Sequence, residues 1–100
     1  MKQLTREEAI RFGESGVWRE WTDLQIVRLQ LFQDCLCVPL DIYYAAIKRV
    51  LHRPVLSHEF STPNIEALRA ECLGDKPSPT WEEIIALIPP EKRIIVGGEP

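Results

Sequence analysis

Apolar positions recur every three to four residues over most of this chain, the spacing that places them on one face of an α-helix. The stretch DLQIVRLQLFQD, residues 23–34, is the most apolar of these, and its aliphatic and aromatic side chains cover more than half of a helix circumference. We therefore expect this helix at the centre of the core. The whole pattern predicts five helices, at about residues 5–12, 23–34, 39–52, 62–74 and 81–88.

Threonine residues begin three of these helices. In each case an acidic or amide side chain stands three residues further on, so that the two side chains can bond to each other's backbone N–H in a capping box. The boxes pair Thr5 with Glu8, Thr22 with Gln25 and Thr80 with Glu83. Trp21 and Ile26 occupy the positions of a hydrophobic staple around the second box. Pro39 suits the first turn of the third helix, and Thr62 with Pro63 suits the cap and first turn of the fourth.

Glycine and proline are expected to end the helices. Their positions are Gly13 and Gly16 for the first helix, Pro54 for the third, Gly74 for the fourth, and Pro89 and Pro90 for the fifth. The second and third helices are joined by a few residues only, which predicts an antiparallel pair. PVL at 54–56 and RIIV at 93–96 are short extended candidates that could pair as a minor two-stranded element.

These patterns predict a mainly α-helical, compact single domain over residues 1–96, with a flexible tail at 97–100. The 100-residue length is enough for one modest core, and 45% hydrophobic residues with 27% charged residues make disorder of the body unexpected. No stretch has the length of a signal peptide core or a membrane span, so we expect a cytosolic protein without membrane contact.

The net charge of -3 arises from mixed acidic and basic residues, which gives neither the positive field of a generic nucleic-acid binder nor the negative field of a DNA mimic. The segment KRVLHR contains Lys48, Arg49 and Arg53, which could contact phosphate. The same cations lie in the last turn of the third helix, where they complement the helix dipole. We favour the second role, and nucleic-acid binding stays an alternative.

The segment RPVLSHEFSTPN holds the densest group of reactive side chains, Ser57, His58 and Glu59. A His beside a Glu is weak grounds for acid-base catalysis, because neighbours in an extended segment point to opposite faces. A metalloprotease helix would need a second His at position 62, which is Thr62. We interpret the segment as a structured loop in which His58 or Glu59 bonds to backbone at the start of the fourth helix and Phe60 anchors in the core.

Three cysteines, Cys35, Cys37 and Cys72, could with His52 or His58 form four zinc ligands. The spacing is not that of a zinc site, and the first two thiols lie in an apolar run. We predict reduced thiols that act as small hydrophobes, with no metal and no cofactor. No phosphate-binding glycine loop, nucleophile elbow or dinucleotide fingerprint occurs in the sequence, and we predict that the protein is not an enzyme.

Aromatic residues on short connections and helix faces are the natural candidates for a protein interface. We favour burial in the core for Trp18 and Trp21, although an exposed Trp would be a natural interface hot spot. The apolar content is generous for a small core, which makes self-association plausible. The candidate partner-binding residues are Trp18, Tyr43, Tyr44, Arg53, His58 and Glu59.

Four segments, LTREEAIRF, LFQDCLCVPLD, RPVLSHEF and PTWEEIIALIPPEKRIIV, resemble a family of small proteins of unknown function encoded by tailed bacteriophages and prophages. The resemblance spans Leu4 to Val96, and RPV followed by HEF is its most recognisable part. The family often has Gly before that Arg and Thr before the His, where this chain has His52 and Ser57. No activity or catalytic residue comes with the resemblance.

The resemblance implies a phage-encoded protein made in the cytoplasm of a bacterial host. By analogy with other small phage proteins, we expect a non-enzymatic accessory protein that binds a host or phage protein, such as an inhibitor of a host factor or of a host defence system, as anti-CRISPR proteins are. A nucleic-acid-associated accessory protein and a small virion or assembly component are the alternatives.

Overall fold

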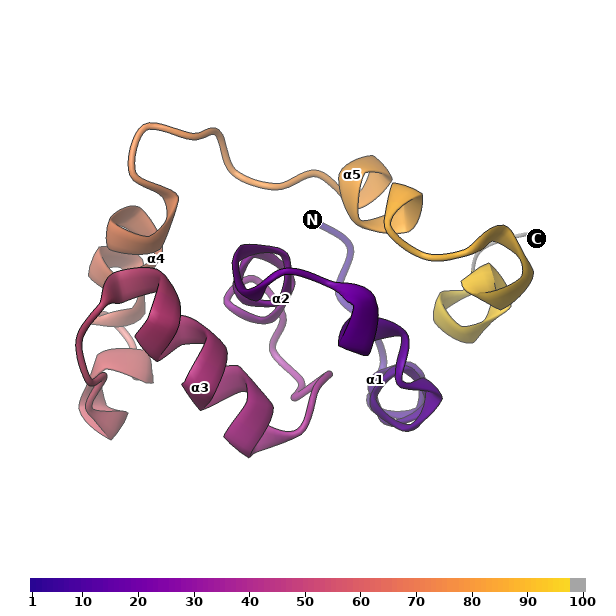
Figure 1. The fold of residues 1–100 in the computed structure, drawn as a ribbon, viewed down its shortest axis with the longest axis horizontal. Coiled ribbons are helices and arrows are strands. Elements are labelled where there is room, and N and C mark those ends of the chain that lie inside the picture. Colours follow the sequence, from indigo (N-terminus) through magenta and orange to yellow (C-terminus); the bar gives the residue numbers. More distant parts are fainter. Residues whose placement is uncertain (98–100) are drawn as a thin grey trace.

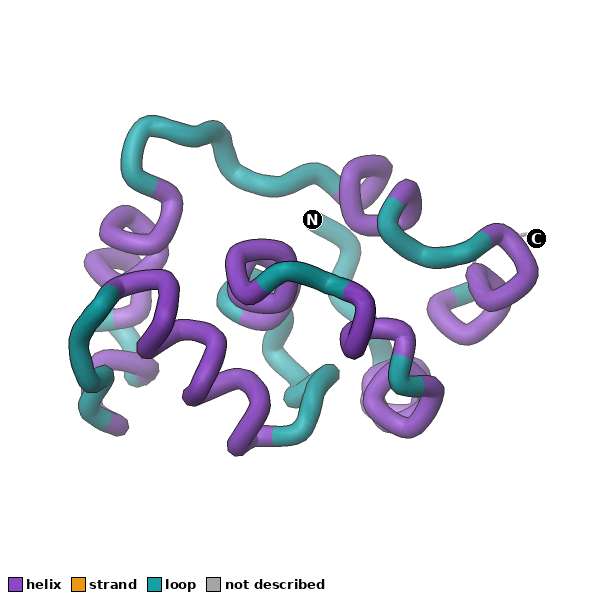
Figure 2. The backbone as a smooth tube through the Cα atoms, in the orientation of Figure 1, coloured by secondary structure: helices purple, strands orange, loops and turns teal. Residues whose placement is uncertain are grey.

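The computed structural model describes residues 1–97, which form helices joined by loops and contain no β-strand (Figures 1 and 2). The five α-helices are α1 (Arg6–Ser15), α2 (Asp23–Gln30), α3 (Leu40–Leu51), α4 (Ile65–Leu73) and α5 (Trp81–Ala86). Three 3₁₀ segments accompany them, namely η1 (Val17–Glu20), η2 (Ser57–Phe60) and η3 (Pro90–Val96). The prediction of a mainly α-helical fold with about five helices is confirmed.

Helix α2 lies at the centre, as its apolar sequence predicts (Figure 1). Helices α3 and α4 pack on one side of it, and α1 with η3 lies on the other side. Every residue of α2 from Ile26 to Gln30 is buried. The largest side chains that are almost fully buried come from all parts of the chain and are Phe12, Leu29, Ile47, Leu68, Ile84 and Ile88. The Cα radius of gyration of 13.1 Å is the value of about 13 Å that a compact chain of this length has.

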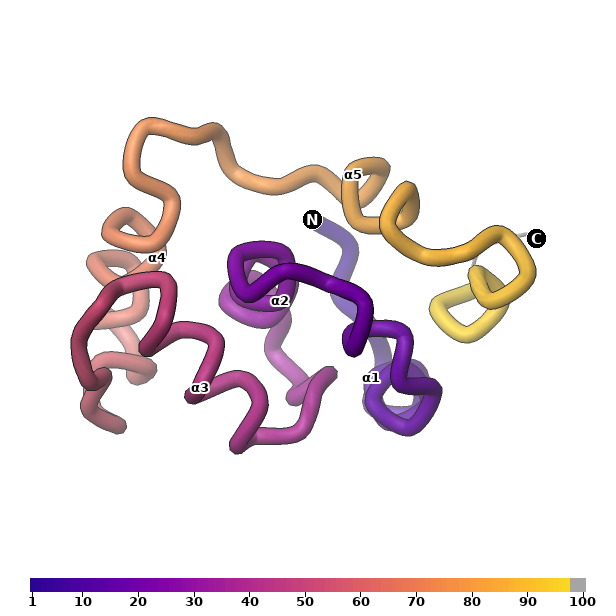
Figure 3. Tube along the Cα trace, viewed as in Figure 1, coloured from indigo at the N-terminus to yellow at the C-terminus, as the bar shows by residue number. Residues whose placement is uncertain are grey.

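Helix α5 is connected to the centre by polar contacts as well as by the core. The buried Arg28 of α2 makes a two-pronged ion pair with Glu83 at 2.9–3.1 Å and donates to the carbonyl of Pro77 at 3.2 Å. The Trp21 indole donates to the Leu87 carbonyl at 3.2 Å. These bonds hold α5 against α2, although a long loop separates α5 from α4 in the chain (Figure 3).

The predicted capping boxes explain where two of the helices begin. Thr5 and Thr22 each accept from the backbone N–H three residues later, and Glu8 and Gln25 bond back to the threonine N–H. At α5, Thr80 accepts from the backbone N–H that follows three residues on, at 3.2 Å, without a return bond.

Some helix ends differ from the prediction. Gly13 lies inside α1, where a Cβ would come 3.1 Å from the Cys37 carbonyl oxygen, and only Gly16, at φ 71°, ends the helix. Helix α2 ends at Gln30 rather than near residue 34, because the next residues form turns and the Gln30 side chain bonds to the following loop. Helix α3 ends at Leu51, and His52 adopts a left-handed conformation with φ 57°.

The fourth and fifth helices are shorter than predicted. Helix α4 begins at Ile65, because residues 61–64 form turns, and Thr62 makes no capping hydrogen bond there. Its peptide bond to Pro63 is cis. Helix α5 ends at Ala86, two residues before the predicted end, and a turn carries the chain to Pro89.

The predicted strand pair is wrong within residues 1–97. The segment at 54–56 is an irregular loop, and RIIV belongs to η3. Pro90 at the start of η3 suits a first helical turn, and a helical rather than extended path brings Val96 into the core, where it is 1% exposed.

The two ends of the described chain lie side by side. The Lys2 ammonium donates to the Val96 carbonyl at 2.9 Å, and the buried Gln33 side chain bonds to the carbonyl of Lys2 and to the N–H of Leu4. Gly97 closes η3 with φ 78°, and the rest of the predicted flexible tail, residues 98–100, lies outside the described part. In that described part no helix has the length and apolar character needed to span a bilayer.

Candidate functional site

The RPVLSHEF segment is organised by one arginine. Arg53 makes paired hydrogen bonds with Glu59 at 2.7 and 3.1 Å and with Glu71 of α4 at 2.8 and 3.0 Å. The Ser57–Phe60 stretch is a 3₁₀ turn, not an extended segment, because Glu59 also accepts the Leu56 N–H at 2.8 Å and so caps that turn. The loop is thereby fastened to both α3 and α4.

The positive charge of Arg53 is shared by two carboxylates, so the cluster has one more negative than positive charge. The Arg53 guanidinium and the Leu56 N–H lower the pKa of Glu59 to about 2, and Arg53 also lowers the pKa of Glu71. The same two carboxylates raise the pKa of Arg53 above its ordinary value. Arg53 and Glu59, both proposed from the sequence as partner-binding residues, are therefore already bound to each other.

The interpretation of this segment as a structured loop agrees with the geometry, with different bonds from those expected. Glu59 caps η2 rather than α4, and the carbonyl of His58 accepts from Ser61 and Asn64. The His58 side chain is exposed and lies on the surface. Phe60 is half-buried, with its ring centroid 5.5 Å from that of Tyr43.

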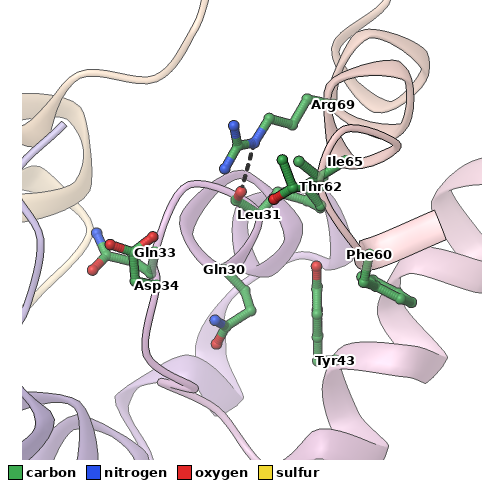
Figure 4. A pocket seen from close by; sticks show the side chains of 9 residues that line it. All are labelled: Gln30, Leu31, Gln33, Asp34, Tyr43, Phe60, Thr62, Ile65 and Arg69. Atoms are coloured by element: carbon green, nitrogen blue, oxygen red, sulfur yellow. Dashed lines mark hydrogen bonds between the residues drawn. The ribbon is translucent and has the colours of Figure 1, made fainter. Parts of the chain in front are cut away.

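A polar pocket of about 250 Å³ lies beside this loop, between the end of α2, α3 and the start of α4 (Figure 4). Its lining residues are Gln30, Leu31, Gln33, Asp34, Tyr43, Phe60, Thr62, Ile65 and Arg69. Arg69 donates from Nε to the Leu31 carbonyl at 2.8 Å and so crosses from α4 to α2. Of this lining, the sequence singled out Tyr43 as a site residue. The others are distant in sequence, and no local pattern marks them.

The aromatic candidates fall into two groups. Trp18 is 8% exposed and its indole donates to the Gly13 carbonyl at 3.0 Å, and Tyr43 is 6% exposed. Neither ring therefore lies on an open surface. The burial that the sequence favoured for Trp18 is confirmed, and neither Trp18 nor Tyr43 is exposed enough to contact a partner directly. Tyr44 is 39% exposed and stacks on Tyr43 with ring centroids 6.2 Å apart.

A second candidate site is an exposed apolar surface that sequence reasoning missed. Ile10 of α1 is 48% exposed and Leu36 of the loop 31–39 is 50% exposed. Both residues line two adjoining depressions of about 290 and 410 Å³. The remaining residues of this lining are Arg6, Ala9, Gly13, Glu14, Cys35, Cys37, Val38 and Pro39. We call it the Ile10–Leu36 surface.

A buried glutamine fixes the shape of this surface. Gln30 donates to the Cys35 carbonyl at 2.9 Å and accepts from the N–H groups of Cys37 at 2.6 Å and Val38 at 3.3 Å. These bonds satisfy the backbone of the loop and fold it over α2, so that Cys37 is buried while Leu36 points outward. The exposure of Leu36 is thus a consequence of a built loop rather than of disorder.

The cysteines do not form a metal centre. In the described residues no three His, Cys, Asp or Glu side chains gather in a way that could hold a metal ion. All three thiols are free, and burial raises the pKa of Cys37 to about 12 and that of Cys72 to about 11. Cys37 and Cys72 pack in the core as small apolar side chains, as predicted.

The basic cluster is largely neutralised. Arg49 makes a paired ion bridge to Asp23 of α2, with both contacts at 2.8 Å, and Arg53 is held by two glutamates. Within residues 1–97, Lys48 is the member of this trio that makes no ion pair. A phosphate would have to compete with carboxylates for the two arginines.

Comparison of the chain with known protein families, with curated proteins and with solved structures finds no match.

Proposed function

We propose that this chain is a phage-encoded, non-enzymatic accessory protein that acts by binding another protein in the cytoplasm of the bacterial host. The observation that carries the proposal is the Ile10–Leu36 surface, on which two large aliphatic side chains stand about half exposed beside two depressions. Contiguous exposed apolar surface on a small protein is typical of a protein interaction site.

The chemistry of this surface favours a protein partner. Its depressions can receive apolar side chains, and Arg6 and Glu14 at its edge can pair with charges of either sign. Helix α1 and the Gln30-bound loop hold it in place, so little ordering is required when a partner binds.

The resemblance to small phage proteins supports a partner from the phage or its host. An inhibitor of a host factor or of a host defence system, as anti-CRISPR proteins are, is one form of this function. A virion or assembly component is another form, in which the partner is a phage structural protein. A nucleic-acid-associated role has less support, because Arg49 and Arg53 are paired with carboxylates.

The test uses two matched surface substitutions. Leu36→Asp places a charge in the proposed interface, and Ile94→Asp places the same charge on η3, where Ile94 is 65% exposed and lies outside the surface. Both variants should fold like the wild type, which circular dichroism and urea denaturation check. Tagged wild type is used to capture partners from infected cells, and the captured protein is then purified and titrated with all three proteins.

We expect binding to the wild type and to Ile94→Asp, and at least about ten-fold weaker binding to Leu36→Asp, because a charge in an apolar contact loses more than about 1.4 kcal/mol. Equal binding by both variants would contradict the use of this surface. Recovery of nucleic acid alone, with a steep loss at high salt, would support the nucleic-acid alternative instead.

A further inference from the structure

Two exposed charges of α1 stand at the helix ends where the helix dipole disfavours them. Arg6 is the first residue of the helix, and Glu14 lies in its last turn. The dipole stabilises acidic side chains at the start of a helix and basic side chains at its end. Within residues 1–97 neither Arg6 nor Glu14 makes an ion pair. Neither the helix itself nor an ion pair in the described chain therefore accounts for this order of charges.

The two charges flank the exposed Ile10 symmetrically. Arg6 precedes Ile10 by four residues and Glu14 follows it by four, so the three side chains form one ridge along α1. Arg6 and Ile10 line one of the two depressions of the Ile10–Leu36 surface, and Ile10 and Glu14 line the other. Ala9 lines both depressions and Gly13 lines one of them, and these small residues leave room beside Ile10.

Such a ridge is complementary to a second copy of itself. Ridges of residues spaced four apart are the ones that most often pack together between two helices. If two α1 helices pack antiparallel about a twofold axis at Ile10, Arg6 faces Glu14 of the second copy, and the symmetry repeats this ion pair. A parallel arrangement would bring like charges together at both ends, which is unfavourable. The charges of α1 thus favour one orientation of one partner.

We propose that the Ile10–Leu36 surface joins two copies of this chain in a symmetric dimer, with antiparallel α1 helices and two Arg6–Glu14 ion pairs. Ile10 of each copy enters a depression of the other, and Leu36 covers the edge of the contact. Closed twofold dimers are the commonest soluble oligomers, because the same surface serves both copies. One helix and one loop make a small interface, so we expect a reversible dimer with a Kd on the order of 10–100 μM.

This inference rests on the proposed function, because it takes the same surface to be a protein interface and names a second copy as an occupant. A host or phage protein that uses the surface has to displace that second copy. Self-association therefore competes with partner binding, and the competition is strongest where the concentration of the chain is high.

The test is analytical ultracentrifugation of the complete chain over about two decades of concentration around the expected Kd. The wild type should change from monomer to dimer in this range. Arg6→Glu and Glu14→Arg should each weaken dimerisation by about ten-fold or more, because each replaces two attractive pairs with two repulsive ones. Both changes suit the helix dipole, so α1 should stay folded, which circular dichroism checks. Lys92→Glu, an exposed charge reversal on η3 outside the surface, should dimerise like the wild type.

The deciding measurement mixes the two single variants in equal amounts. Arg6→Glu has acidic side chains at both ends of the ridge and Glu14→Arg has basic ones, so both ion pairs form again between unlike copies. Both variants keep a negative net charge, so their overall charge does not draw them together. We expect the mixture, and the double variant Arg6→Glu/Glu14→Arg, to dimerise within about three-fold of the wild type.

The proposal would be overturned by a wild type that stays monomeric throughout the range, by a dimer that neither single reversal weakens, or by a mixture that does not recover. A monomeric wild type whose captured partner binds Leu36→Asp more weakly would leave the proposed function standing. A dimer that responds to the reversals, with a captured partner that binds Leu36→Asp and the wild type equally, would support the dimer and refute the proposed function.

Discussion

Replacing Gln30 with leucine is the sharpest test of how this fold is held together. The substitution preserves most of the side-chain volume and removes three hydrogen bonds to the loop 31–39. The N–H groups of Cys37 and Val38 are buried and would lose the one acceptor that they have among residues 1–97. The Cys35 carbonyl, which is partly buried, would lose a donor. An unsatisfied buried group costs about 1–3 kcal/mol.

The magnitude follows from those three groups. Two buried N–H groups in the lower half of that range, with a smaller loss at the partly exposed carbonyl, give a destabilisation of about 3 kcal/mol. A domain of this kind has a free energy of unfolding of about 5–15 kcal/mol, so the loss is a large fraction of the total. With a urea dependence of about 2 kcal/mol per molar, the unfolding midpoint should fall by about 1.5 M.

Gln3→Leu is the matched control for this measurement. Gln3 also bonds to backbone in the same region, with its Nε2 on the Phe32 carbonyl at 2.6 Å and its Oε1 on the Asp34 N–H at 2.8 Å, but both bonds are exposed. Water can replace them, and the loss should stay below about 1 kcal/mol. Equal losses in the two variants, or a loss below about 1 kcal/mol for Gln30→Leu, would refute the argument that burial gives these bonds their weight.

Two further outcomes follow from the charged cluster and the thiols. Above about pH 5, Arg53→Ala should unfold at a lower urea concentration than the wild type. The difference should shrink toward pH 2, because Arg53 lowers the pKa of Glu59 and the pair stabilises the fold only where that carboxylate is ionised. A pH-independent difference in urea midpoint would contradict this. Iodoacetamide at pH 8 should modify Cys35 in the folded protein. Cys37 and Cys72 are buried and have raised pKa values, so they should react only in urea. Mass spectrometry of the intact protein measures how many thiols are modified. Rapid modification of all three in buffer would mean that the core opens easily.

Short-range signals in the sequence predicted the helices well. Thr5 and Thr22 form the reciprocal bonds that the capping box describes, because both partners lie within one turn of chain. The central position of α2 could also be predicted, since apolar side chains cover more than half of its circumference and most of the helix must therefore be buried. These features depend on residues a few positions apart, which is the range over which a single sequence is informative.

The errors have a common physical origin in contacts between distant residues. RIIV has the composition of a strand but forms a 3₁₀ segment, because no second strand lies beside it and its Val96 completes a core built by α1. Gln30 looks like an ordinary polar helix residue, and only the folded loop shows that its amide is buried and bonded to three backbone groups. The bond from Arg69 of α4 to the Leu31 carbonyl and the exposure of Leu36 likewise depend on which elements meet, and no local spacing in the sequence predicts them.

The long loop after α4 has a consequence for how the molecule can be divided. Residues 74–78 are exposed and contribute no side chain to the core, whereas Ile84, Ile88 and Val96 beyond them are almost fully buried. The two parts on either side of the loop meet through the core, the Arg28–Glu83 pair and the Trp21–Leu87 bond, and the loop itself accepts the bond from Arg28 to the Pro77 carbonyl. Two separate peptides that correspond to these parts should therefore reassemble when mixed. That would make the chain a natural scaffold for fragment complementation, in which a signal appears only when both pieces are brought together.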